Sequence, residues 1–335
     1  MRLAALALAA GLAAPAASTA PASQPPAGAP APALAFPLAC QPGRTCEIQH
    51  YVDRDPGPGT QDYRCGLQTY NAHSGIDIRL PSMVALRRGV AVLAAAPGKV
   101  ARLRDGVADI SIRAEGAPSV ANAECGNGVV VDHGGGWETQ YCHMARGSIV
   151  VKVGQPVVAG TALGRVGLSG NTEFPHLHLS VRHNGQVVDP FAPAPTPPGS
   201  CRPQTSLWTP QAQAQMAYHA GAILNAGFTE AQFQQEDLEE GRIRPFTAAS
   251  PWLIAYGRAI ALLPGDEIEL VLRGPDGKVL TQSRRPPLAR WRAQEFTYIG
   301  KRRPPTGWSS GRYTAEYRVW RKGAVALSRH LEIAL

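Results

Sequence analysis

Short apolar runs closed by glycine or proline recur through the chain, and they restrict the possible fold more than any other feature. Runs of this length are typical of β-strands, and no long segment has the periodicity of an amphipathic helix. Six strands are predicted before residue 190, over residues 90–96, 100–103, 110–114, 128–132, 138–144 and 176–182. The pattern therefore predicts a mostly β chain, with a compact antiparallel β-sheet domain over residues 40–195.

The chain pattern changes at a proline-rich stretch, Asp189–Ser200, which predicts a stiff linker that we place at residues 196–205. Beyond it, apolar and more polar residues alternate over 267–272 and 313–319, and a Gly-Pro-Asp-Gly turn follows the first of these runs. Residues 211–225 are a helical candidate. Short alternating strands with such turns predict an immunoglobulin-like β-sandwich over residues 206–335.

The first 22 residues have the layout of a secretory signal peptide. A positive start, Met1-Arg2, precedes an uncharged apolar run that is too short to span a membrane. Small residues follow, and we place cleavage with Ala20 at position −3 and Ala22 at position −1. No cysteine lies close behind the run, which argues against a lipid anchor. The chain is predicted to be exported, either periplasmic or secreted, with no transmembrane anchor after cleavage.

Residues 23–39 consist largely of alanine, proline, glycine, serine and glutamine. Such a segment buries too little apolar surface to offset the entropy cost of ordering, so a disordered spacer is predicted.

An even number of cysteines agrees with export, because disulfides persist in oxidising compartments. Three disulfides are predicted, although spacing cannot choose their pairing, and the absence of a Cys-x-x-Cys pair disfavours a cysteine-ligated zinc site. The six are Cys40, Cys46, Cys65, Cys125, Cys142 and Cys201. The net charge of +8 suits a polyanionic partner. Export disfavours nucleic acid and leaves an anionic polymer of the cell envelope.

Histidines and one aspartate carry the clearest chemical pattern. His176 and His178 are two apart in an apolar run, so on a strand both imidazoles project from one face. His73 and Asp77 are four apart in an earlier segment. Two histidines and one aspartate are the donor set of a catalytic zinc site that keeps its fourth position for water, whereas calcium prefers oxygen ligands alone. With His73 and Asp77 as ligands, only one of the two later histidines is needed.

These segments resemble the lysostaphin/LytM-type family of zinc endopeptidases, which is marked by His-x-x-x-Asp, a later single His, and His-x-His. The likeness covers about residues 73–191, including Asp132-His-Gly-Gly-Gly, the Ser169-Gly-Asn loop and Val188-Asp-Pro. Two departures are Ala72, where the family usually has glycine, and Cys142 directly before His143. We expect Cys142 and His143 to point to opposite faces of their strand.

The resemblance implies zinc bound by His73, Asp77 and His178, with His143 and His176 as the catalytic residues. These two would handle the proton of the attacking water and stabilise the developing oxyanion, in an order that the sequence leaves open. The implied function is a hydrolase, a metalloprotease that cuts peptide cross-links or stems of bacterial peptidoglycan. The alternatives are a non-catalytic relative that binds cell wall or regulates amidases, and a metal-free wall-binding module.

The remaining sequence features receive structural interpretations. His133 lies in a predicted turn and is expected to be structural, and His50, His183, His219 and His330 have no partner pattern. Seven basic residues and three aromatic residues lie between Arg284 and Arg303. This segment is either a patch for anionic polymer or, the more common case, one solvated face of a β-sheet.

Overall fold

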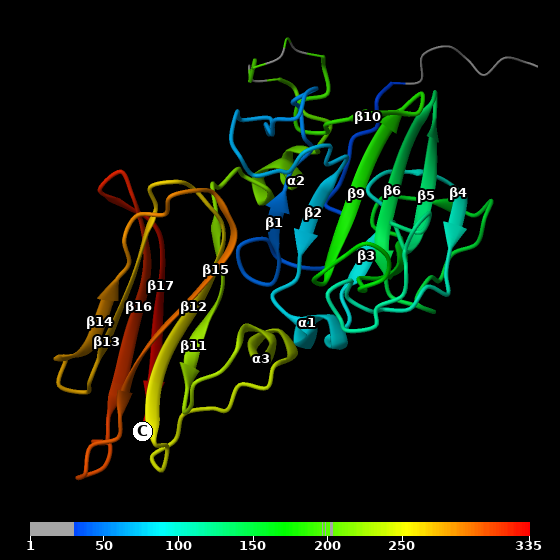
Figure 1. Ribbon diagram of the computed structural model, residues 1–335. Coiled ribbons are helices and arrows are strands. Elements are labelled where there is room, and N and C mark those ends of the chain that lie inside the picture. The colour runs from blue at the N-terminus through cyan, green and yellow to red at the C-terminus, as the bar shows by residue number, and fades with distance from the viewer. Residues whose placement is uncertain (1–29, 196, 198, 202–203) are drawn as a thin grey trace, which may run out of the picture.

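The computed structural model describes residues 30–335 except 196, 198 and 202–203, and two β-rich parts lie side by side in it (Figure 1). Helices are short in the described chain: α1 (Met83–Arg88), α2 (Pro210–Gln215) and α3 (Gln235–Glu240). The predicted mostly β, antiparallel fold class is confirmed. The predicted signal peptide lies outside the described residues. Within them, no helix has the length and apolar character needed to cross a membrane.

The first part is built on an eight-stranded sheet in the order β1-β2-β9-β6-β5-β4-β7, with β10 paired to β9. Its strands are β1 (Glu47–His50), β2 (Ile76–Arg79), β4 (Gly98–Arg104), β5 (Asn127–Gly134), β6 (Trp137–Met144), β7 (Pro156–Val157), β9 (His176–His183) and β10 (Gln186–Val188). A separate two-stranded sheet pairs β3 (Ala91–Leu93) with β8 (Ala162–Arg165). The strands of these two sheets pair antiparallel.

Alternation along the central strands separates the hydrophobic core from the polar site. Leu177 and Leu179 of β9 and Ile76 and Ile78 of β2 are fully buried in the core. The residues between them therefore project from the opposite face of the sheet. Because Asp77 pairs with His178 in register, the intervening polar side chains of the two strands meet on that face.

The second part is a sandwich of two antiparallel sheets. One contains β11 (Ala222–Thr229), β12 (Trp252–Leu262) and β15 (Arg292–Arg302). The other, in the order β14-β13-β16-β17, contains β13 (Glu267–Arg273), β14 (Val279–Arg284), β16 (Arg312–Arg321) and β17 (Ala324–Ala334). Leu253 and Ala255 of one sheet share a core with Leu270 and Tyr317 of the other. This arrangement agrees with the predicted immunoglobulin-like sandwich.

The segment predicted as a disordered spacer is ordered over its last residues, so this prediction is wrong for residues 33–39. Leu34 and Leu38 are buried in the first core. Their segment donates backbone hydrogen bonds from Leu34 to Leu207 and from Ala35 to Ala95. Two leucines that enter an existing core, together with backbone pairing, supply the stabilisation that composition alone does not reveal.

Three other predictions also differ from the structure. Residues 206–216 pack with the first part, because Trp208, Ala212 and Met216 lie in its core, so the predicted start of the second domain at residue 206 is too early. Residues 110–114 form a turn after an isolated bridge at Asp109 rather than a strand. The helical candidate at 211–225 is helical only in α2, and its last residues begin β11.

Three disulfides are present, and no described cysteine is free, as the sequence predicts. Cys40 pairs with Cys46, Cys65 with Cys201, and Cys125 with Cys142. The second bond joins residues 136 apart and ties the proline-rich stretch to the first part. The third lies beside the polar face of β9.

Candidate metal and catalytic site

Three side chains from β2, β9 and the loop before β2 bring their donor atoms to one point. His73 Nε2 lies 3.1 Å from Asp77 Oδ1 and 3.2 Å from His178 Nδ1, and His178 Nδ1 lies 2.9 Å from Asp77 Oδ1. Ligands that hold a tetrahedral zinc at about 2.0–2.1 Å lie roughly 3.3 Å from one another. The spacing and the nitrogen and oxygen donors therefore fit zinc. These are the three ligands that the resemblance implies.

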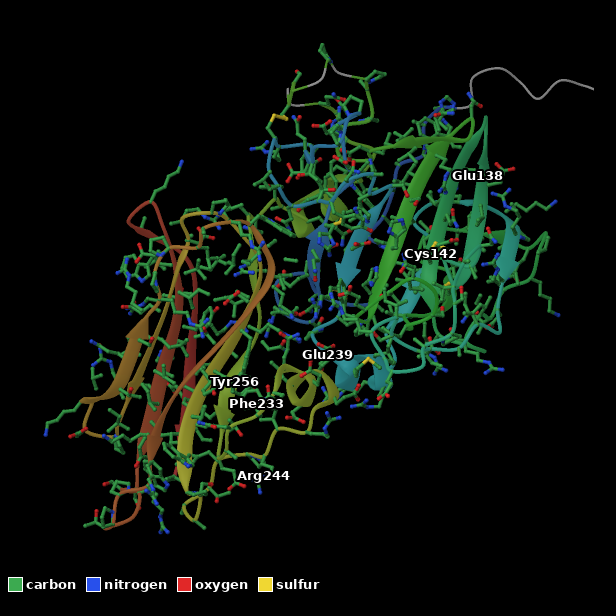
Figure 2. All side chains as sticks on the ribbon, viewed as in Figure 1. Glu138, Cys142, Phe233, Glu239, Arg244 and Tyr256 are labelled. Carbon is green, nitrogen blue, oxygen red and sulfur yellow. A yellow bond between two sulfur atoms is a disulfide. The ribbon has the colours of Figure 1, made fainter. Side chains whose placement is uncertain are left out.

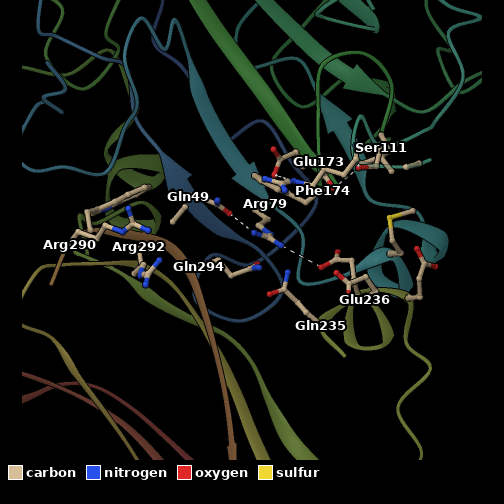
Figure 3. A pocket seen from close by; sticks show the side chains of 18 residues that line it. Gln49, Arg79, Ser111, Glu173, Phe174, Gln235, Glu236, Arg290, Arg292 and Gln294 are labelled. Carbon is tan, nitrogen blue, oxygen red and sulfur yellow. Dashed lines mark hydrogen bonds and ion pairs between the residues drawn. The ribbon is translucent and has the colours of Figure 1, made fainter. Parts of the chain in front are cut away.

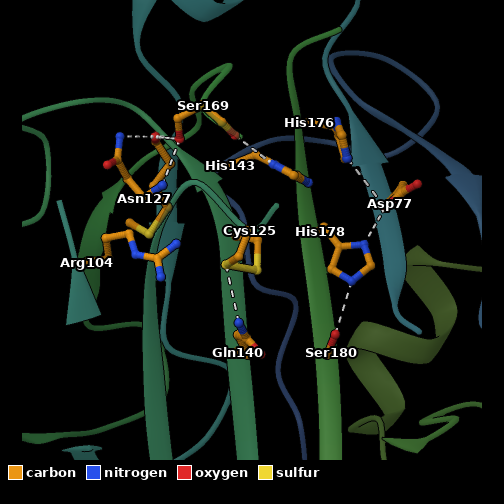
Figure 4. The surroundings of a disulfide bond; sticks show 12 residues. Asp77, Arg104, Cys125, Asn127, Gln140, His143, Ser169, His176, His178 and Ser180 are labelled. Atoms are coloured by element: carbon orange, nitrogen blue, oxygen red, sulfur yellow. Dashed lines mark hydrogen bonds and ion pairs between the residues drawn. A yellow bond between two sulfur atoms is a disulfide. The ribbon is translucent and has the colours of Figure 1, made fainter. Parts of the chain in front are cut away.

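A second partner holds each of these side chains by its other polar atom. His73 Nδ1 donates to the carbonyl oxygen of Tyr51 at 2.7 Å, which leaves Nε2 free of a proton. His178 Nε2 bonds to the Ser180 hydroxyl at 3.0 Å (Figure 4). Partners of this kind fix the ring orientation and the tautomer before a metal binds. The donor atoms of His73 and His178 are thus aimed at the common point.

His50 holds the third side chain, a role that no pattern in the sequence indicates. His50 Nδ1 donates to Asp77 Oδ2 at 2.9 Å, which leaves Oδ1 for the common point. The ring is buried and lies edge-on to Tyr70 at 5.2 Å. It comes from β1, which pairs with β2 and places His50 opposite Asp77. Since 27 residues separate the two in sequence, no local spacing could have identified the contact.

The two predicted catalytic histidines lie next to each other at the edge of this group. The rings of His143 and His176 are 4.6 Å apart, and the ring of His143 is 6.0 Å from that of His178. His143 Nδ1 donates to the carbonyl oxygen of Ser169 at 2.8 Å (Figure 4), and His176 Nδ1 donates to that of Phe174 at 3.0 Å. Nε2 of His143 therefore stays available for proton transfer or hydrogen bonding, whereas Nε2 of His176 lies 3.5 Å from Asp77 Oδ1 and faces the metal ligands.

The backbone at His143 turns its ring toward the site. Cys142 is the register partner of His178, so in a regular strand His143 would face the core. Instead His143 has φ +59°, and its amide donates to the carbonyl of Cys125 at 2.8 Å. The prediction that Cys142 and His143 face opposite sides is therefore wrong. Left-handed backbone at a non-glycine residue costs energy that the surrounding structure must supply.

The structure explains two small residues beside the first metal ligands, Gly75 and Ala72. A Cβ on Gly75 would lie 2.5 Å from His178 Nε2 and 2.6 Å from the carbonyl of Leu179, so a larger residue would displace the ring. Ala72 has φ +62°, which accounts for the family's glycine at this position. Its amide donates to Asp53 at 2.8 Å.

Electrostatics at the site favour an ionised Asp77 and a neutral His143. Burial opposes ionisation of Asp77, but the charges of His73 and His176 and hydrogen bonds from His176 and His178 hold its pKa well below the usual range. Burial, and then the charges of His176 and His178, lower the pKa of His143 well below its ordinary value. A neutral imidazole can accept a proton at neutral pH.

The other histidines and the basic segment lie outside this group. His133 bonds to the Pro97 carbonyl at 2.7 Å and the Thr139 hydroxyl at 2.8 Å, contacts that hold a turn, as expected. Of the basic segment, Arg285 pairs with Glu295 on the sandwich. Trp291 of the same segment reaches the first part, where its ring lies 6.2 Å from that of His50.

Comparison with known proteins gives a match over the part of the chain that holds this site. Residues 71–190 match Peptidase family M23. The chain is 35% identical over 132 residues to DD-carboxypeptidase/endopeptidase Mpg of Neisseria meningitidis, which covers 39% of this chain and 25% of that protein. It is 32% identical over 125 residues to the cell division protein DipM of Caulobacter vibrioides, a match that covers 37% of this chain and 17% of that protein.

Among solved structures, the catalytic domain of the prophage-encoded M23 protein EnpA from Enterococcus faecalis is 25% identical, with a TM-score of 0.29. That match covers 42% of this chain and 88% of the other. The chain spans a quarter or less of the length of the two curated relatives.

Proposed function

We propose that this chain, whose residues 71–190 match Peptidase family M23, is an exported, zinc-dependent endopeptidase that hydrolyses peptide cross-links or stems of bacterial peptidoglycan. The observation that carries the proposal is the donor geometry. His73, Asp77 and His178 present three atoms within 2.9–3.2 Å of one another. Each side chain also forms a hydrogen bond through its other polar atom, which leaves the donor atom at the common point free to bind the metal.

In this proposal His73, Asp77 and His178 hold the zinc ion. Bound zinc supplies a Lewis acid for the scissile carbonyl and lowers the pKa of water to near neutrality. The protein's part is orientation, since the carbonyl of Tyr51, the Ser180 hydroxyl and His50 fix the three ligands. Three protein ligands leave a fourth position open, as in catalytic rather than structural zinc sites.

His143 and His176 carry the proton chemistry in the same proposal. Their Nδ1 atoms are engaged with backbone carbonyls, so Nε2 is the reactive atom of each ring. One accepts the proton of the attacking water and returns it to the leaving amine, while the other donates to the oxyanion. With ring centroids 4.6 Å apart, the two can act on one substrate carbonyl.

The substrate and the location rest on the relatives and on the first residues of the chain. The Neisseria relative is named a DD-carboxypeptidase/endopeptidase, which suggests cell-wall peptides as the substrate. The signal-peptide pattern of residues 1–22 would deliver the enzyme to the periplasm or the medium. The paired cysteines suit the same compartments.

The experiment is to purify the exported protein, measure its zinc, and analyse by mass spectrometry the peptides that it releases from purified peptidoglycan. We expect about one zinc per chain, release of stem or cross-link fragments, and loss of most of the zinc in His178→Ala. Full zinc in that variant would transfer the ligand role to His176.

Two other outcomes would favour the alternatives. Zinc without any cleavage would favour a non-catalytic wall-binding or amidase-regulating relative. Protein that takes up no zinc and still binds wall would favour a metal-free binding module.

A further inference from the structure

A cavity of about 780 Å³ lies where the two parts of the chain meet, beside the candidate site (Figure 3). The first part contributes Gln49, Arg79 and Phe174 to its wall, and the second contributes α3 and residues 290–294. Glu239 of α3 lies at this junction (Figure 2), where it pairs with Arg79 at 3.5 Å and also with the fully buried Arg258. The cavity is therefore formed only when the two parts are together.

The wall adjoins the residues that hold and surround the metal ligands. Gln49 precedes His50, and Arg79 follows Asp77 by two residues on β2. The Phe174 ring is 4.9 Å from that of His176. A peptide whose scissile bond lies between His143 and His176 would therefore extend into this space on one side.

Most of the charges on the wall are neutralised by neighbours. Arg79 pairs with Glu239, Arg113 with Glu173, Glu240 with Arg87, and Arg292 with Glu295. Among the residues that the structure describes, Arg290 and Glu236 form no ion pair, and both are exposed. Figure 3 shows them on opposite sides of the cavity, with Gln49, Arg79 and Gln294 between them. The cavity thus offers one free cation and one free anion at separate ends.

The space between these charges is polar and suits a peptide. The amide side chains of Gln235 and Gln294 line the wall and provide hydrogen-bond donors and acceptors. A peptide unit supplies one acceptor and one donor. The rings of Trp291 and Phe174 add apolar wall for aliphatic side chains.

We propose that this cavity is a substrate subsite, shared by the two parts, for a peptide segment that carries both a carboxylate and an ammonium group. Arg290 binds the carboxylate at one end of the cavity, and Glu236 binds the ammonium at the opposite end. The inference rests on the proposed function, because it assigns the cavity to the same substrate. It also gives the C-terminal sandwich a role in peptide selection.

The test is direct binding, measured by calorimetry on the full chain with His143→Ala as an inactive background. The probe is a synthetic stem-type tetrapeptide with free carboxylates and one side-chain ammonium. Two chemically blocked forms accompany it, one with amidated carboxylates and one with an acetylated ammonium. Each block should weaken binding by about tenfold, the effect of losing one charged hydrogen bond.

Paired variants then locate each interaction. Arg290→Ala should bind the free peptide about tenfold more weakly, with no further loss on amidation, and Glu236→Gln should lose sensitivity to acetylation alone. Arg244→Ala is the matched control, because Arg244 is exposed on the same part of the chain, away from Glu239 (Figure 2). It should bind like the parent.

Two results would overturn the proposal: equal binding of the free and blocked peptides, or unchanged binding in both cavity variants. Cleavage of purified peptidoglycan by the wild-type chain is scored separately. Cleavage without the predicted binding pattern would remove the cavity assignment and leave the proposed function standing. The predicted binding pattern without any cleavage would remove the proposed function and leave the cavity assignment standing.

Discussion

Replacement of His50 tests whether a residue outside the motifs prepares the metal site. His50 Nδ1 donates at 2.9 Å to Asp77 Oδ2, and the two side chains are 8% and 4% exposed. In His50→Ala the carboxylate loses this donor, while no water can easily replace it at such burial. Asp77 is then free to rotate, so Oδ1 is no longer held at the common point with His73 and His178.

The magnitude follows from two independent considerations. A buried acceptor left without a partner costs about 1–3 kcal/mol. Loss of a partner behind a metal ligand typically weakens metal binding about 10–100-fold. At about 1.4 kcal/mol per factor of ten these ranges agree. We therefore expect the zinc dissociation constant of His50→Ala to rise about 10–100-fold, and the metal-free protein to lose about 1–3 kcal/mol of unfolding free energy.

The assay is zinc titration against a competing chelator, with denaturant unfolding of the metal-free protein alongside. His50→Asn is the matched control, because its amide nitrogen can take the place of Nδ1 and should restore most of the affinity. His330→Ala, at a side chain 54% exposed, should change nothing. A dissociation constant for His50→Ala within about twofold of wild type, well short of the expected loss, would refute the positioning role.

Three further predictions follow from single sites. His143→Ala and His176→Ala should each keep zinc yet lose about 10²–10⁴ in peptidoglycan cleavage; near-wild-type turnover would make that histidine a bystander. Burial raises the pKa of Glu47 to about 7 from 4.5, so wild type loses stability as pH rises through this window. Glu47→Gln should be up to about 3 kcal/mol more stable at about pH 8 and no different near pH 4 in denaturant unfolding. Ala72→Gly, which relieves a φ of +62°, should raise the unfolding free energy by about 0.5–1 kcal/mol in denaturant unfolding. An unfolding free energy below that of the wild type would contradict backbone strain at this position.

The sequence by itself determined the features that depend on local pattern. Short apolar runs bounded by glycine or proline predict strands at 128–132, 138–144 and 176–182, and these are present as β5, β6 and β9. The two-residue spacing of His176 and His178 places both on one face, because side chains alternate along a strand whatever its neighbours are. The even cysteine count likewise predicts full pairing, which the structure contains.

Only the tertiary structure decided what depends on how distant segments pair. The contact of His50 with Asp77 requires β1 beside β2, and the bond between Cys65 and Cys201 joins residues 136 apart. Leu34 becomes ordered because a core formed by later residues receives it. The cavity between Arg290 and Glu236 exists because the sandwich docks on the first part. Such contacts arise from strand order and docking, and local sequence spacing does not encode either.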